Sequence, residues 1–120
     1  MILVDSAVWI DHFHSQYTQL EGLLESDQVV AHSLVIEELA AGSIKDRAVT
    51  LALLGGLRPA PVLQHYELME LIEEHRLWGR GLSVVDLHLL GSCLLQPGLA
   101  LMTNDKRLAE AAVGLGIPTE

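Results

Sequence analysis

Basic residues are scarce in this chain. It has 7 Lys and Arg against 16 Asp and Glu, which gives a formal charge of −9 with histidine neutral. An acidic protein does not attract nucleic acid through its long-range electrostatic field, so a simple DNA-binding module is disfavoured. This charge does not exclude a nuclease, because carboxylates that hold metal ions add to the negative count.

Cysteine is almost absent. Cys93 is the only one in the chain, so no internal disulfide can form, and its apolar surroundings predict a thiol that packs. A reducing, cytoplasmic location is the simplest expectation for such a protein. The N-terminus has no basic segment, and Asp5 interrupts its apolar start, so no signal peptide is predicted.

A long stretch between Asp86 and Asp105 contains no Asp, Glu, Lys or Arg. It is about long enough to span a bilayer. Pro97 and Gly98 break it, however, and it contains several polar side chains. The stretch is therefore predicted to be a buried helix followed by a buried strand, with no membrane association. A length of 120 residues predicts a single domain over residues 1–120, and half of the residues are hydrophobic, which is enough to form its core.

Apolar periodicity and turn residues predict alternating strands and helices. Strands are expected at residues 2–4, 28–32, 60–63 and 99–102, with Ile117 as a candidate fifth strand. Helices are expected at residues 7–14, 19–25, 34–41, 47–54, 66–78 and 83–95, and from 104 or 105 to 113. Ser6 and Ser33 are expected to cap the helices that follow them. This order predicts an α/β fold, a three-layer α/β/α domain with a mostly parallel four- to five-stranded sheet.

Four carboxylates fall at strand ends or near helix starts in this arrangement. Asp5 follows the first strand and Asp105 follows the strand 99–102, while Asp86 lies in the first turn of a helix. Glu38 borders the apolar side of its helix, whereas Glu37 points to solvent. Ligands bind outside the carboxyl ends of parallel strands, so Asp5, Glu38, Asp86 and Asp105 are expected to converge.

Converging carboxylates raise one another's pKa values and titrate as a coupled set. A hard cation such as Mg²⁺ or Mn²⁺ relieves this repulsion, because it takes carboxylate oxygens together with water. Such a site suits phosphoryl transfer or phosphodiester hydrolysis. The sequence therefore predicts a metal site.

Most of these carboxylates have a structural alternative. Asp86 can form a capping box with Ser83. Asp105 can cap the last helix, and Glu38 can be a flank residue of an amphipathic helix. Asp5 follows a buried strand and has no cationic neighbour in sequence, so a purely structural role is hardest to argue for it.

Other polar residues offer weaker signals. Ser92 and Cys93 lack a base at suitable spacing, so nucleophilic catalysis is disfavoured. His88 follows Asp86 by two residues, and a packed histidine is the simpler interpretation. Basic side chains near the predicted site either contact a phosphate of the substrate or are solvated. These candidate phosphate-binding residues are Arg76, Arg80, Lys106 and Arg107.

Four short motifs occur in order along the chain. They are Ile-Leu-Val-Asp-Ser at 2–6, Glu-Leu-Ala-Ala-Gly at 38–42, Val-Asp-Leu-His-Leu-Leu at 85–90 and Thr-Asn-Asp-Lys-Arg-Leu at 103–108. Together they resemble PIN-domain ribonucleases, in particular the VapC toxins of type II toxin–antitoxin systems. The segment 87–93 departs mildly from the commonest Asp-x-x-Ile-Ala-Ala form, which leaves the choice of substrate open.

The resemblance implies a catalytic, metal-binding set of Asp5, Glu38, Asp86 and Asp105, with Thr103 as an auxiliary hydroxyl. It implies Mg²⁺ or Mn²⁺ as cofactor and RNA as substrate, cleaved to 5′-phosphate and 3′-hydroxyl ends. It also implies a homodimer that a VapB-like antitoxin silences.

Two other functions stay open on the sequence. One is a phosphoacceptor signalling domain of the receiver type, which has a similar length and an Asp after its first strand. Against it, no central strand ends in a phosphorylatable Asp, and Ser6 follows Asp5 where a second acid belongs. The other is a non-catalytic partner protein whose carboxylates bind metal only to fold.

Overall fold

One parallel sheet organises the molecule. The computed structural model describes residues 1–15 and 18–120, and its strands are β1 (Ile2–Val4), β2 (Val29–Ala31), β3 (Arg58–Pro59) and β4 (Ala100–Met102). They lie in the order β3-β2-β1-β4, and every pairing among them is parallel. β1 is therefore central, and the residue that follows it emerges in the middle of one edge of the sheet.

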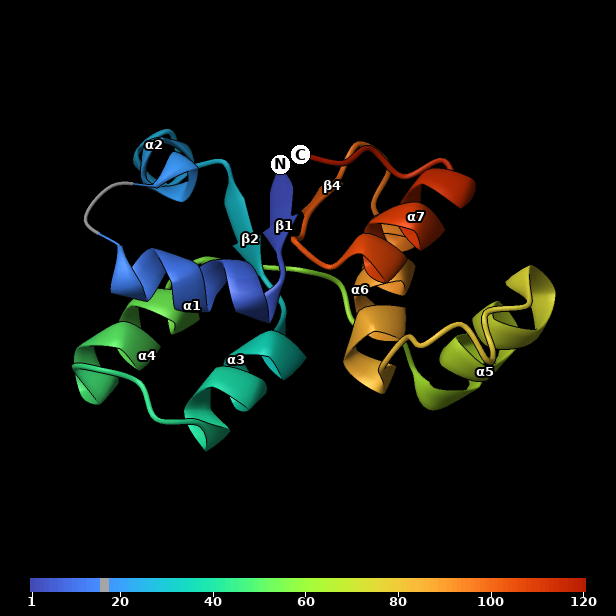
Figure 1. Ribbon diagram of the computed structural model, residues 1–120, viewed down its shortest axis with the longest axis horizontal. Helices are drawn as coiled ribbons and strands as arrows, with labels where there is room; N and C mark the ends of the chain where they lie inside the picture. Colours follow the sequence, from blue (N-terminus) through green and yellow to red (C-terminus); the bar gives the residue numbers. More distant parts are fainter. Residues whose placement is uncertain (16–17) are drawn as a thin grey trace.

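Helices connect the strands and cover both sides of the sheet. They are α1 (Ser6–His14), α2 (Gln19–Glu25), α3 (Ser33–Ala41), α4 (Arg47–Gly55), α5 (His65–His75), α6 (Val84–Leu95) and α7 (Lys106–Gly114). Figure 1 shows α1 to α4 on one side of the strands and α5 to α7 on the other, with both chain ends beside β1 and β4. The predicted three-layer α/β/α fold is confirmed. No helix in the described ranges is long and apolar enough to cross a membrane.

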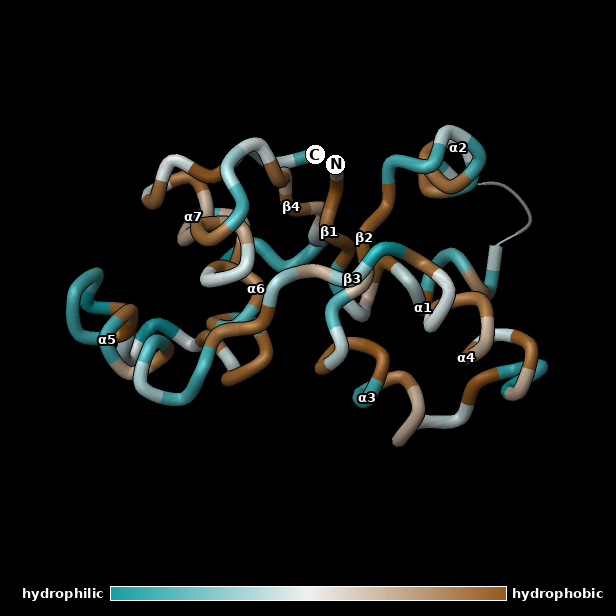
Figure 2. Tube along the Cα trace, turned by 180° about the vertical axis from the view of Figure 1, so that it is seen from behind, coloured by the Kyte–Doolittle hydropathy of each residue, from teal (hydrophilic) through white to brown (hydrophobic). Residues whose placement is uncertain are grey.

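The core forms because β1 and α6 are apolar on almost every side. Leu3 and Val4 of β1 and Leu89 and Leu90 of α6 are each 0% exposed. Figure 2 shows β1, β2 and much of α6 in hydrophobic colours, and hydrophilic ones around α5. The uncharged stretch is thus a buried helix followed by a buried strand, as predicted. Burial raises the pKa of the Cys93 thiol to about 12, so this side chain is a packing group.

Two strand predictions are wrong, and proline explains both. The strand expected at 60–63 is absent, and β3 occupies Arg58–Pro59 instead. Pro61 has no N–H to continue the ladder. The strand expected at Ile117 is also absent, because only an isolated bridge joins Leu101 to Thr119. Pro118 accepts from Leu101 N at 2.8 Å but cannot donate in return.

Several helix ends also differ from expectation, and for three of them the structure shows the reason. Ser6 and Ser33 were expected as N-caps, but both lie inside their helices, and Asp5 and His32 are the caps. In each case the side chain before the serine accepts a backbone N–H, so the helix starts one residue earlier. The helix expected to reach residue 78 ends at His75, because Arg76 adopts a left-handed conformation with φ +53°.

Gly91 marks the tightest contact between α6 and the segment after β3. A Cβ at this position would collide with Leu63 Cδ1 and lie 2.8 Å from Leu63 Cγ. Because Leu63 is buried in the core, it cannot move without loss of packing. We expect Gly91→Ala to lower the free energy of unfolding by about 1–3 kcal/mol, measured by urea denaturation.

Gly22→Ala is the matched control, because nothing lies within 4 Å of a Cβ built on Gly22 in α2. There the helix gains an alanine without a clash, so stability should rise by up to about 1 kcal/mol. Equal effects of the two substitutions would contradict the close packing of α6 on Leu63.

Candidate active site

Asp5 lies at the centre of the site. It follows β1 directly, caps α1, and is 8% exposed. Its Oδ1 accepts the backbone N–H of Ser6 at 2.7 Å, and its Oδ2 accepts the hydroxyl of Thr103 at 2.8 Å. The carboxylate is therefore held at the carboxyl edge of the sheet by two donors from different elements.

The pKa of Asp5 is raised above its ordinary value of 3.8. Burial is the largest cause, and the hydrogen bonds from Thr103 and Ser6 oppose it. The negative charges of Asp86 and Glu38 raise the pKa further. Two of the other three predicted carboxylates are therefore close enough to act electrostatically on Asp5.

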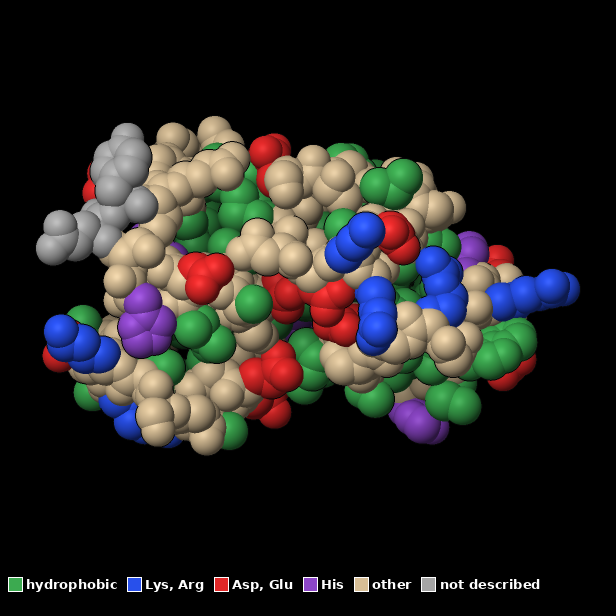
Figure 3. All heavy atoms as spheres, in the orientation of Figure 1, with side chains coloured by type: hydrophobic (Ala, Val, Ile, Leu, Met, Phe, Trp, Pro, Cys, Tyr) green, Lys and Arg blue, Asp and Glu red, His purple; other side chains and the backbone are tan. Residues whose placement is uncertain are grey.

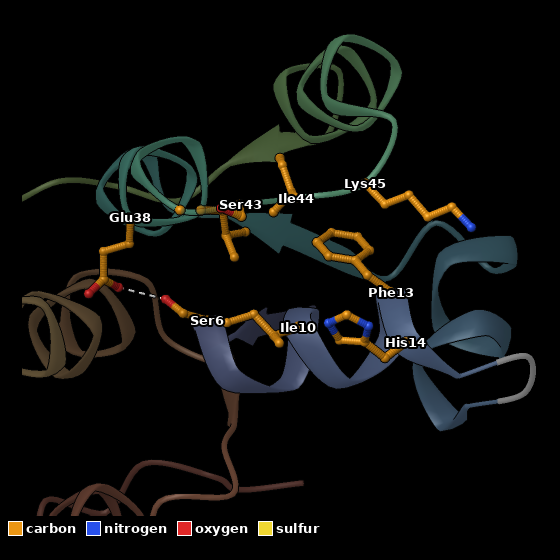
Figure 4. Close-up of a pocket in the computed structure, with 10 residues that line it drawn as sticks. Ser6, Ile10, Phe13, His14, Glu38, Ser43, Ile44 and Lys45 are labelled. Carbon is orange, nitrogen blue, oxygen red and sulfur yellow. Dashed lines mark hydrogen bonds between the residues drawn. The ribbon is translucent and has the colours of Figure 1, made fainter.

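Glu38 is joined to Asp5 through Ser6. The Ser6 hydroxyl donates to Glu38 Oε1 at 2.6 Å, across the gap between α1 and α3 (Figure 4). Sequence reasoning assigned Ser6 to helix capping and missed this contact. The available signal was a hydroxyl directly after Asp5, but only the packing of α3 beside α1 brings Glu38 to it.

Asp86 lies in the first turn of α6 and forms the capping box considered from the sequence. Its Oδ2 accepts from Ser83 N at 2.9 Å, and its own N–H donates to Ser83 Oγ at 3.0 Å. A carboxylate has two oxygens with two lone pairs each, so capping leaves acceptor capacity. The structural role and a role in the site are compatible at this residue.

Asp105 is placed differently from the other three carboxylates. Its Oδ1 caps α7 by accepting from Arg107 N at 2.9 Å and Leu108 N at 3.2 Å. Its backbone N–H donates to Thr103 Oγ1 at 3.0 Å, and the same hydroxyl donates to Asp5. Asp105 is thus linked to Asp5 through Thr103, and its charge is not among those that shift the pKa of Asp5.

The four candidate phosphate-binding residues come from two neighbouring regions. Lys106 and Arg107 begin α7, while Arg76 caps the end of α5 and Arg80 lies in the turn that follows. Figure 3 shows basic side chains beside the acidic cluster in the middle of this face. In residues 1–15 and 18–120, the one salt bridge lies elsewhere and joins Arg58 to Asp27.

Two histidine rings, His32 and His88, lie close together between α3 and α6. His32 caps α3 by accepting Leu34 N–H at its Nδ1, and its ring centroid lies 5.9 Å from that of His88 on α6. Because Nδ1 accepts, the proton of a neutral His32 sits on Nε2. Burial lowers the pKa of His32 to about 4 and also lowers that of His88. His32 is therefore a neutral packing and capping group, and its protonated Nε2 is unsuited to a metal.

Comparison with known proteins agrees with this geometry. Residues 2–114 match the PIN domain family. The chain belongs to the PIN-domain family. Two relatives, both named Ribonuclease VapC32, come from the CDC 1551 / Oshkosh and H37Rv strains of Mycobacterium tuberculosis. Each is 50% identical to this PIN domain over 117 residues, which cover 98% of this chain and 94% of the relative. The resemblance to VapC-type PIN-domain ribonucleases is confirmed, and with it the prediction of a nuclease at the level of the family.

The donor set of this PIN domain fits a hard divalent cation. The residues that meet at the site offer carboxylate and hydroxyl oxygens, which Mg²⁺ and Mn²⁺ prefer. The raised pKa of Asp5 reflects burial and the repulsion that such a cation would relieve. Among the described residues, no three His, Cys, Asp or Glu side chains are already gathered into a metal-ligand group.

A cavity of about 300 Å³ opens beside the acidic site of the PIN domain. Its walls are apolar side chains of α1, α3 and the segment after α3, including Ile10, Phe13 and Ile44. Figure 4 shows Ser6 and Glu38 at one end and Lys45 at the other. The acidic site and an apolar surface are therefore continuous.

The raised pKa of Asp5 generates a stability prediction. The folded protein binds the Asp5 proton more tightly than the unfolded chain does, so wild-type stability falls as pH rises from 3.8 through the raised pKa. Asp5→Asn removes this cost. We expect the metal-free variant to be at least as stable as the wild type at neutral pH, with an advantage that vanishes below pH 3.8.

Urea denaturation in EDTA at neutral and acidic pH measures this difference. Asp11→Asn is the control, because Asp11 is an exposed carboxylate on the same helix, α1. If Asp5→Asn were clearly less stable than the wild type at neutral pH, the stabilisation from the two hydrogen bonds to Asp5 would exceed the cost of burying its charge. That result would contradict the prediction.

Proposed function

We propose that this PIN domain is a VapC-type endoribonuclease toxin that hydrolyses RNA phosphodiester bonds with Mg²⁺ or Mn²⁺. The observation that carries the proposal is the buried Asp5 carboxylate at the end of the central strand, with the charges of Asp86 and Glu38 acting on it. The name of the relatives at 50% identity supports the same activity.

We propose that Asp5, Glu38, Asp86 and Asp105 are the catalytic residues and hold the cation, with Asp5 and Asp86 as the most direct ligands. A bound divalent cation lowers the pKa of water and stabilises negative charge on the departing oxygen. Asp105 contributes only if its carboxylate keeps capacity beyond the cap of α7, which its second oxygen provides.

The chain's own residues supply orientation in this proposal. Thr103 holds Asp5 from one side, and Ser6 holds Glu38 in place on the other. Water attacks the phosphorus in line, the bond to the 3′ oxygen breaks, and that oxygen takes a proton. The products are then a 5′-phosphate and a 3′-hydroxyl, as the family resemblance implies.

The partners in this proposal follow from the family. We propose a homodimer in the cytoplasm whose activity a VapB-like antitoxin blocks. The apolar cavity next to Glu38 supports the antitoxin part of the proposal, because an antitoxin segment lying there would reach the acidic site directly. Burial of its apolar walls would contribute to the affinity of that complex.

A nuclease assay tests the proposed function. We expect the wild type to cut total cellular RNA into discrete products with Mg²⁺ or Mn²⁺ and not with EDTA, and Asp86→Asn to lose at least about a hundredfold in rate. The asparagine oxygen can still accept from Ser83, so α6 keeps its cap. Sequencing of the product ends identifies the cleavage site.

Glu38→Gln and Glu37→Gln form a matched pair on α3. Only the first should lower the rate, because it removes a negative charge that acts on Asp5, whereas the charge of Glu37 is not among those that do. Equal cleavage by wild type and Asp86→Asn would mean contamination and remove the support for the proposal. No cleavage, together with phosphate uptake from acetyl phosphate, would favour the receiver-type function. No cleavage with stability that depends on Mg²⁺ would favour a metal-binding partner protein.

The acidic surface makes the local basic side chains decisive for RNA binding. We expect replacement of Arg76, Arg80, Lys106 and Arg107 by Glu to weaken RNA binding by at least about tenfold and to flatten its dependence on salt. Fluorescence anisotropy over a salt series measures both. Unchanged affinity after all four replacements would show that RNA follows another path.

A further inference from the structure

The side chain of Arg107 rests on a glycine. Arg107 is in the first turn of α7, and Gly81 lies just before Ser83, the N-cap of α6. A Cβ built on Gly81 would lie 2.6 Å from Arg107 Nη1 and 3.0 Å from its Cδ. Gly81 also has φ +74°, a conformation that favours glycine. The guanidinium thus occupies space that any other residue at position 81 would fill.

This contact places a cation between the starts of two helices that carry site residues. Asp86 lies in the first turn of α6, and Asp105 caps α7. Arg107 nevertheless forms no salt bridge with either carboxylate, and none with any other acid in the described part of the chain. In a protein of charge −9, an arginine positioned beside carboxylates without pairing to them is available to an anion from outside.

We propose that Arg107, whose guanidinium lies in the space left by Gly81, binds a phosphate of the RNA backbone next to the scissile bond and sets the position of the strand in the site. This inference rests on the proposed function. A guanidinium makes two parallel hydrogen bonds to phosphate oxygens, and the missing side chain at Gly81 leaves the space in which it can do so. Figure 3 shows basic side chains next to the acidic cluster on this face.

The Gly81→Ala variant distinguishes the position of the Arg107 guanidinium from the presence of its charge. The variant keeps Arg107 and every other charge, but its Cβ displaces the guanidinium, which is the flexible end of an exposed side chain. Gly79→Ala is the matched control. Gly79 has φ +68°, close to that of Gly81, and nothing lies within 4 Å of a Cβ built there. Both variants carry a similar backbone penalty, and only Gly81→Ala moves Arg107.

RNA binding is measured by anisotropy of a short fluorescein-labelled RNA with Mg²⁺, in an Asp5→Asn background that is expected not to cleave. We expect Arg107→Gln to weaken binding about tenfold and to reduce the salt slope by about one. Arg107→Lys should keep the slope without the full affinity. Gly81→Ala should weaken binding about fivefold, and should have no further effect once Arg107 is Gln. Gly79→Ala should bind as the parent does.

Three outcomes would overturn the inference. They are an unchanged salt slope in Arg107→Gln, equal effects of Gly81→Ala and Gly79→Ala, and additive effects of Gly81→Ala and Arg107→Gln. RNA cleavage by the wild type decides the proposed function separately. If the wild type cleaves and any of these outcomes is found, the proposed function stands and the role of Arg107 fails. If it neither cleaves nor binds RNA, both fail.

Discussion

A buried carboxylate constrains this structure. Asp5 sits where the central strand ends, with little solvent to stabilise its charge and with Asp86 and Glu38 nearby. Hydrogen bonds offset part of the free-energy cost of burying this charge, because the first turn of α1 and the Thr103 hydroxyl both donate to Asp5. The Asp5 carboxylate has hydrogen-bond donors, but the negative charges of Asp86 and Glu38 still repel it. A bound cation would relieve this repulsion, which the folded chain alone does not.

The same side chains serve folding and the proposed chemistry. Asp5 caps α1, Asp86 closes the capping box of α6, and Asp105 caps α7. Helix N-termini stabilise negative charge, so a helix start at the carboxyl edge of a parallel sheet is an economical place for a carboxylate. The structural and catalytic interpretations of these residues, which compete when the sequence is read alone, are therefore both consistent with the structure.

Prediction from sequence succeeded where the signal was local or periodic. Alternating apolar segments sufficed for the layer order and the parallel sheet, and the burial of α6 followed from its missing charges. It failed where a single side chain or a missing N–H determines where a helix or strand begins or ends. His32, and not the predicted Ser33, is the N-cap of α3. Pro61 and Pro118 have no N–H with which to extend the hydrogen-bond ladder of the sheet. Helix ends and edge strands depend on such single donors, which periodicity does not detect.

The sequence by itself determined the fold class, the positions of the four carboxylates along the chain and the resemblance to a nuclease family, because strand and helix periodicities and short motifs are properties of neighbouring residues. Only the tertiary structure decided which groups meet. Ser6 and Glu38 are 32 residues apart, and Thr103 reaches Asp5 across 98 residues. The contact of Arg107 with Gly81 likewise joins the first turn of α7 to the loop before α6. Such contacts depend on how the helices pack around the sheet. A local sequence pattern does not specify which residues far apart in the chain will meet.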